Sequence, residues 1–479
     1  MMDLIVRNGH VVFPGKGVRK ADIGIEAGKF VAIADHINND AKKVIDAGNK
    51  YVFPGVVDSH FHVGIYRPFS DDARSESASA AAGGVTTILS YFRSGKNYMN
   101  TSEPYSSLFK KVLEQSAGNF YTDYGFNLAP ILKKHVEEIP ELVSKNGVST
   151  FKYYMFYKGL NLKSEVKKGS VEKEYLLSDE PYDLGHMYNI MKKISEVNEN
   201  YGNVRLSIHA EDAEIIRINL EKTREEMDRE KLNPLQAYSK ARPPSSERIA
   251  IIEAFELAHE THCPINLLHV SSRLALETIN EMKRQFPDVD VYVETTPSHL
   301  TLTVNSDAGI HGKVNPPIRS GDDRDFLWKG IIDGMINTVG SDHAAIEESR
   351  KGNELWTAEN GYGATELLLP AIITGGYVER KIPLEKLASL ITANPARVHS
   401  LYGRKGDIAL GFDGDLVILD INKKRKIRYQ DLHSAQDFTP FEGLELYGQP
   451  EYTILRGNVT YSDGKFGDPL GEYIKRPVA

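Results

Sequence analysis

The sequence predicts an α/β fold in which a TIM-like (β/α)8 barrel is joined to a small β-domain built from both chain termini. Short β-like runs alternate with helical stretches from about residue 51 to residue 404, and such alternation is typical of parallel β/α units. Both ends of the chain instead show short strands and tight turns. An alternating segment of about 350 residues suits a barrel of eight β/α units with insertions.

The N-terminal 50 residues predict hairpins. Asn8-Gly9 and Ala27-Gly28 each lie between two short apolar runs, which is the pattern of a two-residue hairpin turn. The C-terminal part repeats it, with a strand at 415–419 and a hairpin at 453–461. The predicted parts are a β-domain of 1–52 plus 405–462, a barrel of 53–404 and a tail of 463–479. The alternative is two unrelated β-caps.

The middle of the chain supplies the barrel elements. Strands are predicted at 86–91, 203–209 and 265–270, and a helix at 246–255, opened by Ser245 or Ser246 after a pair of prolines. In such a barrel the carboxyl ends of the strands face the active site. The charged stretch 165–174 predicts a solvated loop or helix.

Composition narrows the function classes. The 58 Lys and Arg residues are outnumbered by 66 Asp and Glu, a net charge of −8, which disfavours nucleic-acid binding. No apolar run approaches the roughly 20 residues of a membrane span, and the first residues lack the pattern of a secretory leader. Cys263 is the single cysteine, so no intramolecular disulfide can form. We therefore expect a cytoplasmic protein that acts on a small molecule.

Two histidines follow the apolar run 52–57, in the motif Asp58-Ser59-His60-Phe61-His62. Residues i and i+2 of a strand share a face, so His60 and His62 are expected to point in one direction. Two converging imidazoles can form half of a metal site. The alternative is one packed histidine and one surface histidine.

Three further polar residues, His209, His269 and Asp342, also follow β-like runs. Taken singly, each histidine is better explained as a hydrogen-bonded core residue, and the aspartate as a loop cap. In a parallel barrel, however, the strand ends converge on one mouth. Burying four imidazoles and a carboxylate there without an ion would leave polar groups unpaired, which is costly. Together these residues predict a metal centre.

Lys152 lies within an aromatic-rich run, residues 149–158. Burial among Phe and Tyr side chains favours the neutral amine over the ammonium ion. A neutral amine can react with CO2 to give a carbamate, an anion whose two oxygens can bridge two divalent ions. The alternative is a lysine whose charged end reaches water.

These motifs, in this order, resemble those of the cyclic amidohydrolases, the family of D-hydantoinase, dihydropyrimidinase, allantoinase and dihydroorotase. The likeness runs from residues 55–62 through Ala393-Asn394-Pro395-Ala396 and Arg404-Lys405-Gly406 to 413–417, and so covers nearly the whole chain. It implies a barrel with a β-sandwich-like domain from both termini, which agrees with the strand pattern. It also implies a homo-oligomer, commonly a tetramer, in which the tail after Tyr461 is a plausible interface element.

The resemblance also implies a site. Two divalent metal ions, usually zinc, would be held by His60, His62 and Asp342 on one ion, His209 and His269 on the other, and carboxylated Lys152 (N6-carboxylysine) between them. A hydroxide bridging the ions would attack the carbonyl of a cyclic amide, and Asp342 would move its proton to the leaving nitrogen.

Substrate contacts are implied as well. Tyr157 matches the tyrosine that steadies the oxyanion in hydantoinases, with aromatic packing as its alternative role. Asn315 and Asn360 match loops that touch the substrate, and Asp58 is expected to orient a ligand histidine.

The motifs conflict over the substrate. Dihydroorotases carry an arginine where Gly64 stands here, although Arg67, three residues later, could still bind an anion. Residues 151–158 resemble hydantoinases, whereas Asn315-Pro316-Pro317 resembles allantoinases. We expect a hydrolase that opens a hydantoin or dihydropyrimidine ring, with allantoinase or dihydroorotase as the alternative.

Two rivals from other classes are a non-catalytic dihydropyrimidinase-related scaffold and a mononuclear deaminase. The scaffold proteins have lost metal ligands, whereas all six expected ligands are present here. The deaminases lack a lysine corresponding to Lys152. The expected partner is therefore a small cyclic amide or ureide, with neither nucleic acid nor a membrane involved.

Overall fold

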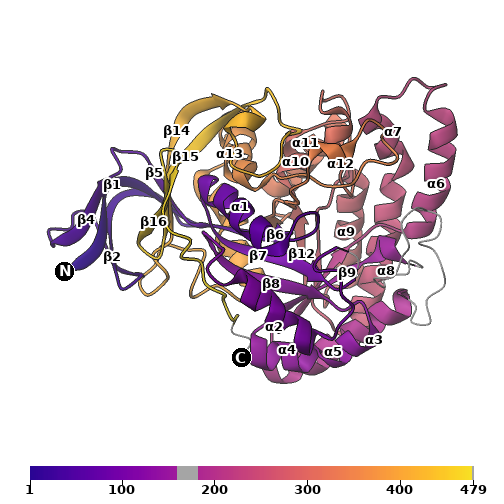
Figure 1. The fold of residues 1–479 in the computed structure, drawn as a ribbon, viewed down its shortest axis with the longest axis horizontal. Coiled ribbons are helices and arrows are strands. Elements are labelled where there is room, and N and C mark those ends of the chain that lie inside the picture. Colours follow the sequence, from indigo (N-terminus) through magenta and orange to yellow (C-terminus); the bar gives the residue numbers. More distant parts are fainter. Residues whose placement is uncertain (96, 159–181, 477–479) are drawn as a thin grey trace.

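The computed structural model describes residues 1–95, 97–158 and 182–476. An eight-stranded parallel sheet is nearly closed into a barrel, and a separate nine-stranded mixed sheet lies beside it. In Figure 1 the N-terminal strands (indigo) and C-terminal strands (yellow) lie together on the left, and the barrel with its helices lies on the right. The predicted fold class is confirmed. The charged stretch 165–174 lies outside the described residues.

The nine-stranded sheet is built from both chain ends. Its order is β17-β16-β15-β14-β5-β1-β2-β3, with β4 beside β1. The strands are β1 Met2–Phe13, β2 Gly17–Glu26, β3 Lys29–Ala34, β4 Ala41–Asp46, β5 Tyr51–Pro54, β14 Leu416–Lys426, β15 Glu445–Leu455, β16 Asn458–Ser462 and β17 Lys465–Phe466. Because β5 pairs antiparallel with β14, the two termini share one sheet and the alternative of two unrelated caps is wrong.

One predicted N-terminal hairpin is wrong and the other is confirmed. Asn8-Gly9 lies inside β1, where the register with β2 shifts between Val6 and Gly9. Asn8 adopts a left-handed φ of 59°, and its N–H donates to Asp22 Oδ1 at 2.9 Å, so a neighbouring side chain satisfies the group that the bulge removes from the ladder. Ala27-Gly28 does turn β2 into β3, and β15 and β16 form the predicted C-terminal hairpin.

The barrel strands pair in chain order and in parallel. They are β6 Val56–Phe61, β7 Val85–Arg93, β8 Asp123–Ala129, β9 Thr150–Tyr154, β10 Arg205–His209, β11 Ile265–Leu267, β12 Val291–Thr295 and β13 Thr338–Val339. The ends of the sheet meet where Phe61 bridges His343 and the His62 N–H donates to the His343 carbonyl oxygen at 2.8 Å. This contact brings the residues after β6 next to those after β13.

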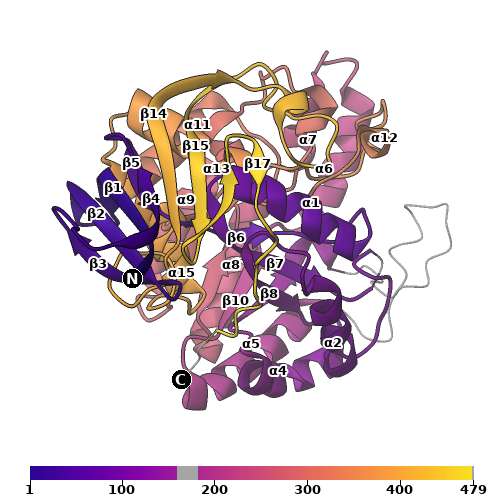
Figure 2. The same ribbon diagram turned by 60° about the vertical axis from the view of Figure 1, so that its left-hand side comes forward.

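Helices cover the outside of the barrel (Figures 1 and 2). The α-helices of the described residues are α1 Phe69–Ala82, α2 Tyr105–Ser116, α3 Lys133–Glu137, α4 Ile139–Asn146, α5 Leu184–Tyr201, α6 Ala213–Glu226, α7 Pro234–Ala241, α8 Pro244–Thr261, α9 Arg273–Gln285, α10 Pro297–Thr301, α11 Gly321–Ile332, α12 Glu348–Lys351, α13 Leu368–Ile372, α14 Leu384–Ile391 and α15 Ala393–Val398. Helix α8 begins earlier than predicted because Pro244 occupies its first turn, where no backbone donor is needed. Within the described residues, no helix has the length and apolar character to cross a bilayer.

The apolar run 52–57 is divided between the two sheets at Gly55. Residues before it belong to β5 and residues after it to β6. A Cβ at Gly55 would lie 2.1 Å from Thr86 Oγ1, so only glycine permits this close approach. As a result, the strand that carries His60 is held at its start by the nine-stranded sheet.

A buried lysine ties the two sheets together. Lys405 Nζ lies 2.6 Å from Asp123 Oδ2 on β8, and 2.9 and 2.7 Å from Asp413 and Asp415, which precede β14. The three carboxylates have the spacing of a metal-binding group, but the ammonium ion of Lys405 already lies among them. The cluster is therefore an ionic link within the fold.

The described part of the tail packs against its own barrel. The Gly471 N–H donates to the Phe120 carbonyl oxygen at 2.9 Å, and the Ile474 N–H donates to the Tyr124 carbonyl oxygen at 2.8 Å. Ile474 and Arg476 are buried. These two side chains stabilise the chain itself and are not available to a partner.

Candidate metal centre

Three of the six predicted ligands meet where the barrel closes. Asp342 Oδ1 lies 3.1 Å from His60 Nε2 and 3.3 Å from His62 Nε2. Potential ligand atoms of the three residues all lie within 4.8 Å of one another. Asp342 follows β13 with a left-handed φ of 52°, which turns its carboxylate back toward the histidines of β6. This arrangement suits one divalent ion.

The other two histidines continue the cluster around the mouth. His209 ends β10, and His269 follows β11 by two residues. Their ring centroids are 4.2 Å apart, and the His269 ring lies 5.3 Å from that of His60. His269 Nδ1 is buried and has no hydrogen-bond partner among the described residues, and His60 Nε2 is buried with only the Asp342 carboxylate beside it. A buried imidazole nitrogen without a partner, beside other imidazoles and a carboxylate, fits a site for metal ions.

Lys152 lies on β9 at the same mouth and is 1% exposed. Its Nζ is 4.5 Å from the Tyr91 ring centroid and 4.8 Å from that of Tyr154. Burial lowers the pKa of Lys152 to about 7, because few polar groups replace the lost water. The neutral amine, which is the form that reacts with CO2, is thus well populated near neutral pH.

Burial also favours the neutral imidazole in three of these histidines. The pKa values of His62 and His209 are lowered to about 4, and that of His269 is lowered well below its usual range. Burial opposes ionisation of Asp342, but the neighbouring His60 and His62 outweigh it and hold the pKa of that carboxyl below its usual range. Neutral imidazoles and an ionised carboxylate are the forms that bind metals.

A second set of side chains, not predicted from the sequence, fixes the ligands in place. His60 Nδ1 lies 2.6 Å from Glu294 Oε1 at the end of β12, and His62 Nδ1 lies 2.8 Å from the Tyr98 hydroxyl. His209 Nε2 lies 2.6 Å from Glu211 Oε2. Such partners set the tautomer and the ring orientation of a ligand histidine. Two features of the sequence could have indicated these partners. Glu294 lies near the end of a β-like run, and Glu211 stands two positions after His209.

Glu211 is itself held by Arg242. The guanidinium donates to both carboxylate oxygens, at 3.0 and 2.5 Å. Burial raises the pKa of Glu211, but Arg242 and His209 oppose it and lower the pKa to about 2. The imidazole of His209 is therefore held in place by the ion pair between Glu211 and Arg242.

The role expected for Asp58 is wrong. Its carboxylate accepts hydrogen bonds from the Ser341 N–H at 2.9 Å and from the Thr365 hydroxyl at 2.8 Å, and its contact with His60 is to the backbone N–H. Asp58 therefore holds the backbone next to Asp342, and Glu294 orients the imidazole of His60.

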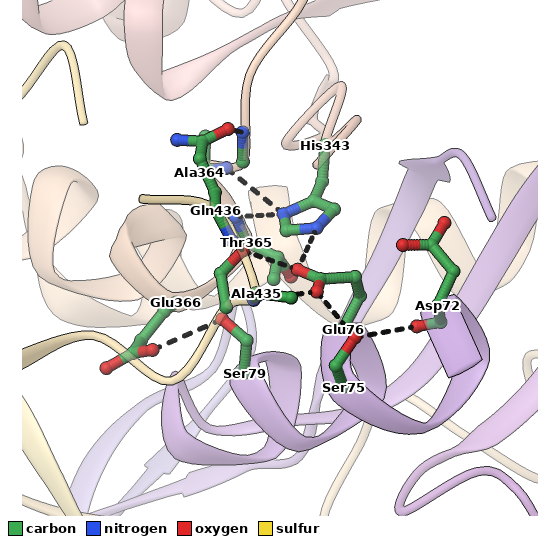
Figure 3. A network of polar contacts seen from close by, with 12 residues as sticks. Asp72, Ser75, Glu76, Ser79, His343, Ala364, Thr365, Glu366, Ala435 and Gln436 are labelled. Atoms are coloured by element: carbon green, nitrogen blue, oxygen red, sulfur yellow. Dashed lines mark hydrogen bonds and ion pairs between the residues drawn. The ribbon is translucent and has the colours of Figure 1, made fainter. Parts of the chain in front are cut away.

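A buried network holds the residue that follows Asp342 (Figure 3). His343 Nε2 lies 2.9 Å from Glu76 Oε2 on α1, and His343 Nδ1 accepts from the N–H groups of Ala364 and Thr365 at 3.1 and 3.3 Å. Glu76 also accepts from the Ser434 hydroxyl at 2.6 Å. Three segments far apart in the sequence thus fix the loop that carries the candidate metal ligand.

Of the residues predicted to touch substrate, one lies just after β9 and two lie in loops that a tyrosine joins. Tyr157 is half-buried, with its ring centroid 5.0 Å from that of Tyr154. The Tyr238 hydroxyl lies 2.6 Å from Asn315 Oδ1 and 2.8 Å from Asn360 Oδ1, so this tyrosine joins the two asparagine loops. Tyr238 was not predicted from the sequence.

The guanidinium of Arg67 contacts side chains of α1. Its Nη1 lies 3.6 Å from Glu76 Oε1 and donates to the Ser75 hydroxyl at 3.1 Å. Because α1 already supplies this guanidinium with a carboxylate, the structure gives no support to an anion site at Arg67.

A parallel barrel whose mouth gathers four histidines, a buried lysine and an aspartate defines a class of enzymes that use divalent metals. Comparison with known proteins gives the family. The chain belongs to the amidohydrolase family, whose model matches residues 178–460. The resemblance drawn from the motifs is thereby confirmed.

Relatives of known name match along almost the full chain. An allantoinase from Desulfitobacterium hafniense (strain Y51) is 31% identical, covering 99% of this chain and 98% of its own. An L-hydantoinase from Paenarthrobacter aurescens is 30% identical with the same coverage. Among solved structures, the L-hydantoinase (dihydropyrimidinase) from Arthrobacter aurescens aligns with a TM-score of 0.86 and 28% identity, covering 99% and 100% of the two chains. The dihydropyrimidinase from Brevibacillus agri aligns at 0.85 and 25%, covering 100% and 99%.

Proposed function

We propose that this protein is a binuclear metal-dependent hydrolase that opens a cyclic amide ring of the hydantoin or dihydropyrimidine type. The convergence of His60, His62 and Asp342 beside His209 and His269 carries the proposal. Family membership and relatives named hydantoinase and allantoinase support the reaction class.

We assign the first ion to His60, His62 and Asp342, and the second to His209 and His269. Zinc suits imidazole and carboxylate ligands. Lys152 would serve both ions after carboxylation, in which its amine nitrogen forms a bond to the carbon of CO2 and releases one proton. The lowered pKa of Lys152 supports this step, because only the unprotonated amine has the required electron pair.

The bound ions supply Lewis acidity toward the ring carbonyl and activate water. The residues of the chain handle the proton. Ionised Asp342 accepts a proton from the attacking water and delivers it to the ring nitrogen as the carbon–nitrogen bond breaks. Glu294 and Tyr98 hold His60 and His62 in place during this exchange. Tyr157, Asn315 and Asn360 are proposed to position the ring.

Allantoin is the second candidate substrate, because an allantoinase is among the relatives at 31% identity. We further propose that the protein is a cytoplasmic homotetramer, by analogy with the family. Light scattering of the purified protein tests the assembly.

Metal analysis and a substrate panel test the function. We expect about two zinc ions per chain and hydrolysis of at least one of hydantoin, dihydrouracil, allantoin and dihydroorotate. Lys152→Ala should lose activity and regain part of it with added short carboxylic acids, which can replace the carbamate. Two bound ions with no hydrolysis of any cyclic amide would overturn the proposal, as would full activity in untreated Lys152→Ala.

A further inference from the structure

Arg93 is a buried cation at the mouth of the barrel. It is the last residue of β7 and is 7% exposed. Within the described residues its guanidinium lies within ion-pair distance of no carboxylate, and its Nη1 donates to the Ser94 carbonyl oxygen at 3.1 Å. Burying a charge without a counter-charge lowers the stability of the folded protein. The position of Arg93 therefore suggests that it serves a function in the site.

The other buried arginines of the described chain are each satisfied within the fold. Arg205, Arg242 and Arg319 pair with Asp290, Glu211 and Glu247, respectively. Arg476 donates to three oxygens, namely Gly147 O, Asn127 Oδ1 and Phe126 O. Arg93 thus differs from them in having neither a carboxylate nor a set of carbonyl acceptors among the described residues.

The position of Arg93 on β7 directs it to the site. Tyr91, two residues earlier, has its ring 4.6 Å from that of His60 and 4.5 Å from Lys152 Nζ. Alternate residues of a strand share a face, and two residues span about 7 Å. Arg93 therefore faces the same interior as Tyr91, one step nearer the open end where a substrate enters.

Two tyrosines frame the guanidinium. Its central carbon lies 5.5 Å from the ring centroid of Tyr98 and 5.5 Å from that of Tyr157. The Tyr98 hydroxyl lies 2.8 Å from His62 Nδ1, so one tyrosine separates Arg93 from a candidate metal ligand. The rings stabilise and orient the planar cation, yet they leave it with its positive charge uncompensated.

We propose that Arg93 binds a carboxylate carried by the substrate, so that the substrate is an anionic cyclic amide or ureide. This inference rests on the proposed function and narrows its substrate class. The planar guanidinium matches a carboxylate through two parallel hydrogen bonds. Arg93 would hold the carboxylate of the substrate at the open end of the barrel, away from the metal ligands. The carbonyl group of the substrate ring would then face the metal ligands. Arg67, which α1 engages through Glu76, does not compete for this role.

Matched substrate pairs test the proposal. Dihydroorotate and dihydrouracil differ by one carboxylate, and hydantoin-5-acetate and hydantoin differ by one carboxymethyl group. We expect the zinc-loaded wild-type enzyme to favour the charged member of at least one pair by about 100-fold in kcat/KM, the size expected for a charge-assisted hydrogen-bond pair. Arg93→Gln should lower this ratio of kcat/KM values by about 100-fold. Arg93→Lys should lower it by less, because lysine keeps the positive charge but cannot form the two parallel hydrogen bonds.

Arg67→Gln is the matched control, because it removes a nearby guanidinium that already has a partner, and it should leave the ratio unchanged. Preference for the neutral member in both pairs, or an unchanged ratio in Arg93→Gln, overturns the proposal while leaving the proposed function intact. The preference of the wild-type enzyme between charged and neutral substrates tests the proposal even if the Arg93 variants do not fold.

If no cyclic amide is hydrolysed, the proposed function fails, and binding then tests Arg93 separately. Calorimetry with hydantoin-5-acetate and hydantoin on the zinc-loaded protein should show at least tenfold tighter binding of the acid, lost in Arg93→Gln. Equal binding of the two compounds would overturn the proposal.

Discussion

Lys152→Met should stabilise the protein when metal ions and bicarbonate are absent. The substitution replaces a buried amine with an apolar chain of similar length. Burial lowers the pKa of Lys152 from its ordinary 10.5 to about 7, so the folded state disfavours the ammonium ion that the unfolded chain carries. A difference of about 3.5 between these pKa values corresponds to about 5 kcal/mol of lost stability.

The sign of the pH dependence follows from this linkage. Below pH 7 the lysine is protonated in both states and the full cost of burying the charge is present. Between pH 7 and 10.5 the unfolded chain binds the additional proton, so the stability of the wild type rises with pH. The advantage of Lys152→Met should therefore be largest near pH 6 and nearly absent at pH 10.

Thermal unfolding measures the effect. An unfolding entropy of about 2.1 cal/mol/K per residue, over 479 residues, gives about 1 kcal/mol/K for the chain. A stabilisation of about 5 kcal/mol then raises Tm by about 5 °C at pH 6. Zinc and bicarbonate should reverse the order, because the variant cannot form the proposed carbamate.

Lys405→Met is the matched control. Lys405 is as buried as Lys152, but it lies among three aspartates that raise its pKa. The same substitution should therefore destabilise the protein, by about 3–5 kcal/mol. Equal Tm values for the wild type and Lys152→Met at pH 6, or a difference that stays constant up to pH 10, would refute the reasoning.

Three further outcomes are expected. Glu294→Gln should weaken zinc binding by about 10- to 100-fold in chelator competition, because Glu294 orients His60. The control Glu256→Gln, at an exposed position, should not change zinc affinity. Equal zinc affinities for the wild type and Glu294→Gln would contradict this role of Glu294. Glu76→Ala should lower kcat about tenfold, with less effect on KM, because His343 loses its anchor, and Glu76→Gln should recover part of the loss; wild-type kcat in the alanine variant would show that the network does not position Asp342. Chelation should abolish hydrolysis, and zinc with bicarbonate should restore it; a metal-stripped enzyme with full activity would exclude a metal mechanism.

The ligand cluster could be predicted because it depends on local patterns and one rule of topology. Alternation along β6 places His60 and His62 on one face, and parallel strands deliver their carboxyl ends to one mouth. His209 and His269 follow from the same rule. None of these predictions needed the identity of a distant neighbour.

The partners of the ligands could not be predicted in this way. Glu294 is 234 residues from His60, and Glu76 is 267 residues from His343. An acidic residue at a strand end or in a helix has many possible partners until the chain is packed. Arg67 shows the same limit. Its position in the sequence suggested an anion site, but in the fold its guanidinium lies beside the carboxylate of Glu76 on α1.

By itself the sequence determined the fold class and the candidate metal ligands, since both follow from short-range periodicity and strand direction. Tertiary structure alone decided which buried charges are paired. Asn8-Gly9 suits a turn and a bulge equally, and the position of β2 selected the bulge. Lys152 and Lys405 are both buried lysines, yet the first lies against aromatic rings and the second among carboxylates. Electrostatic free energy depends on the groups within a few ångströms in space, and distance along the chain does not specify them.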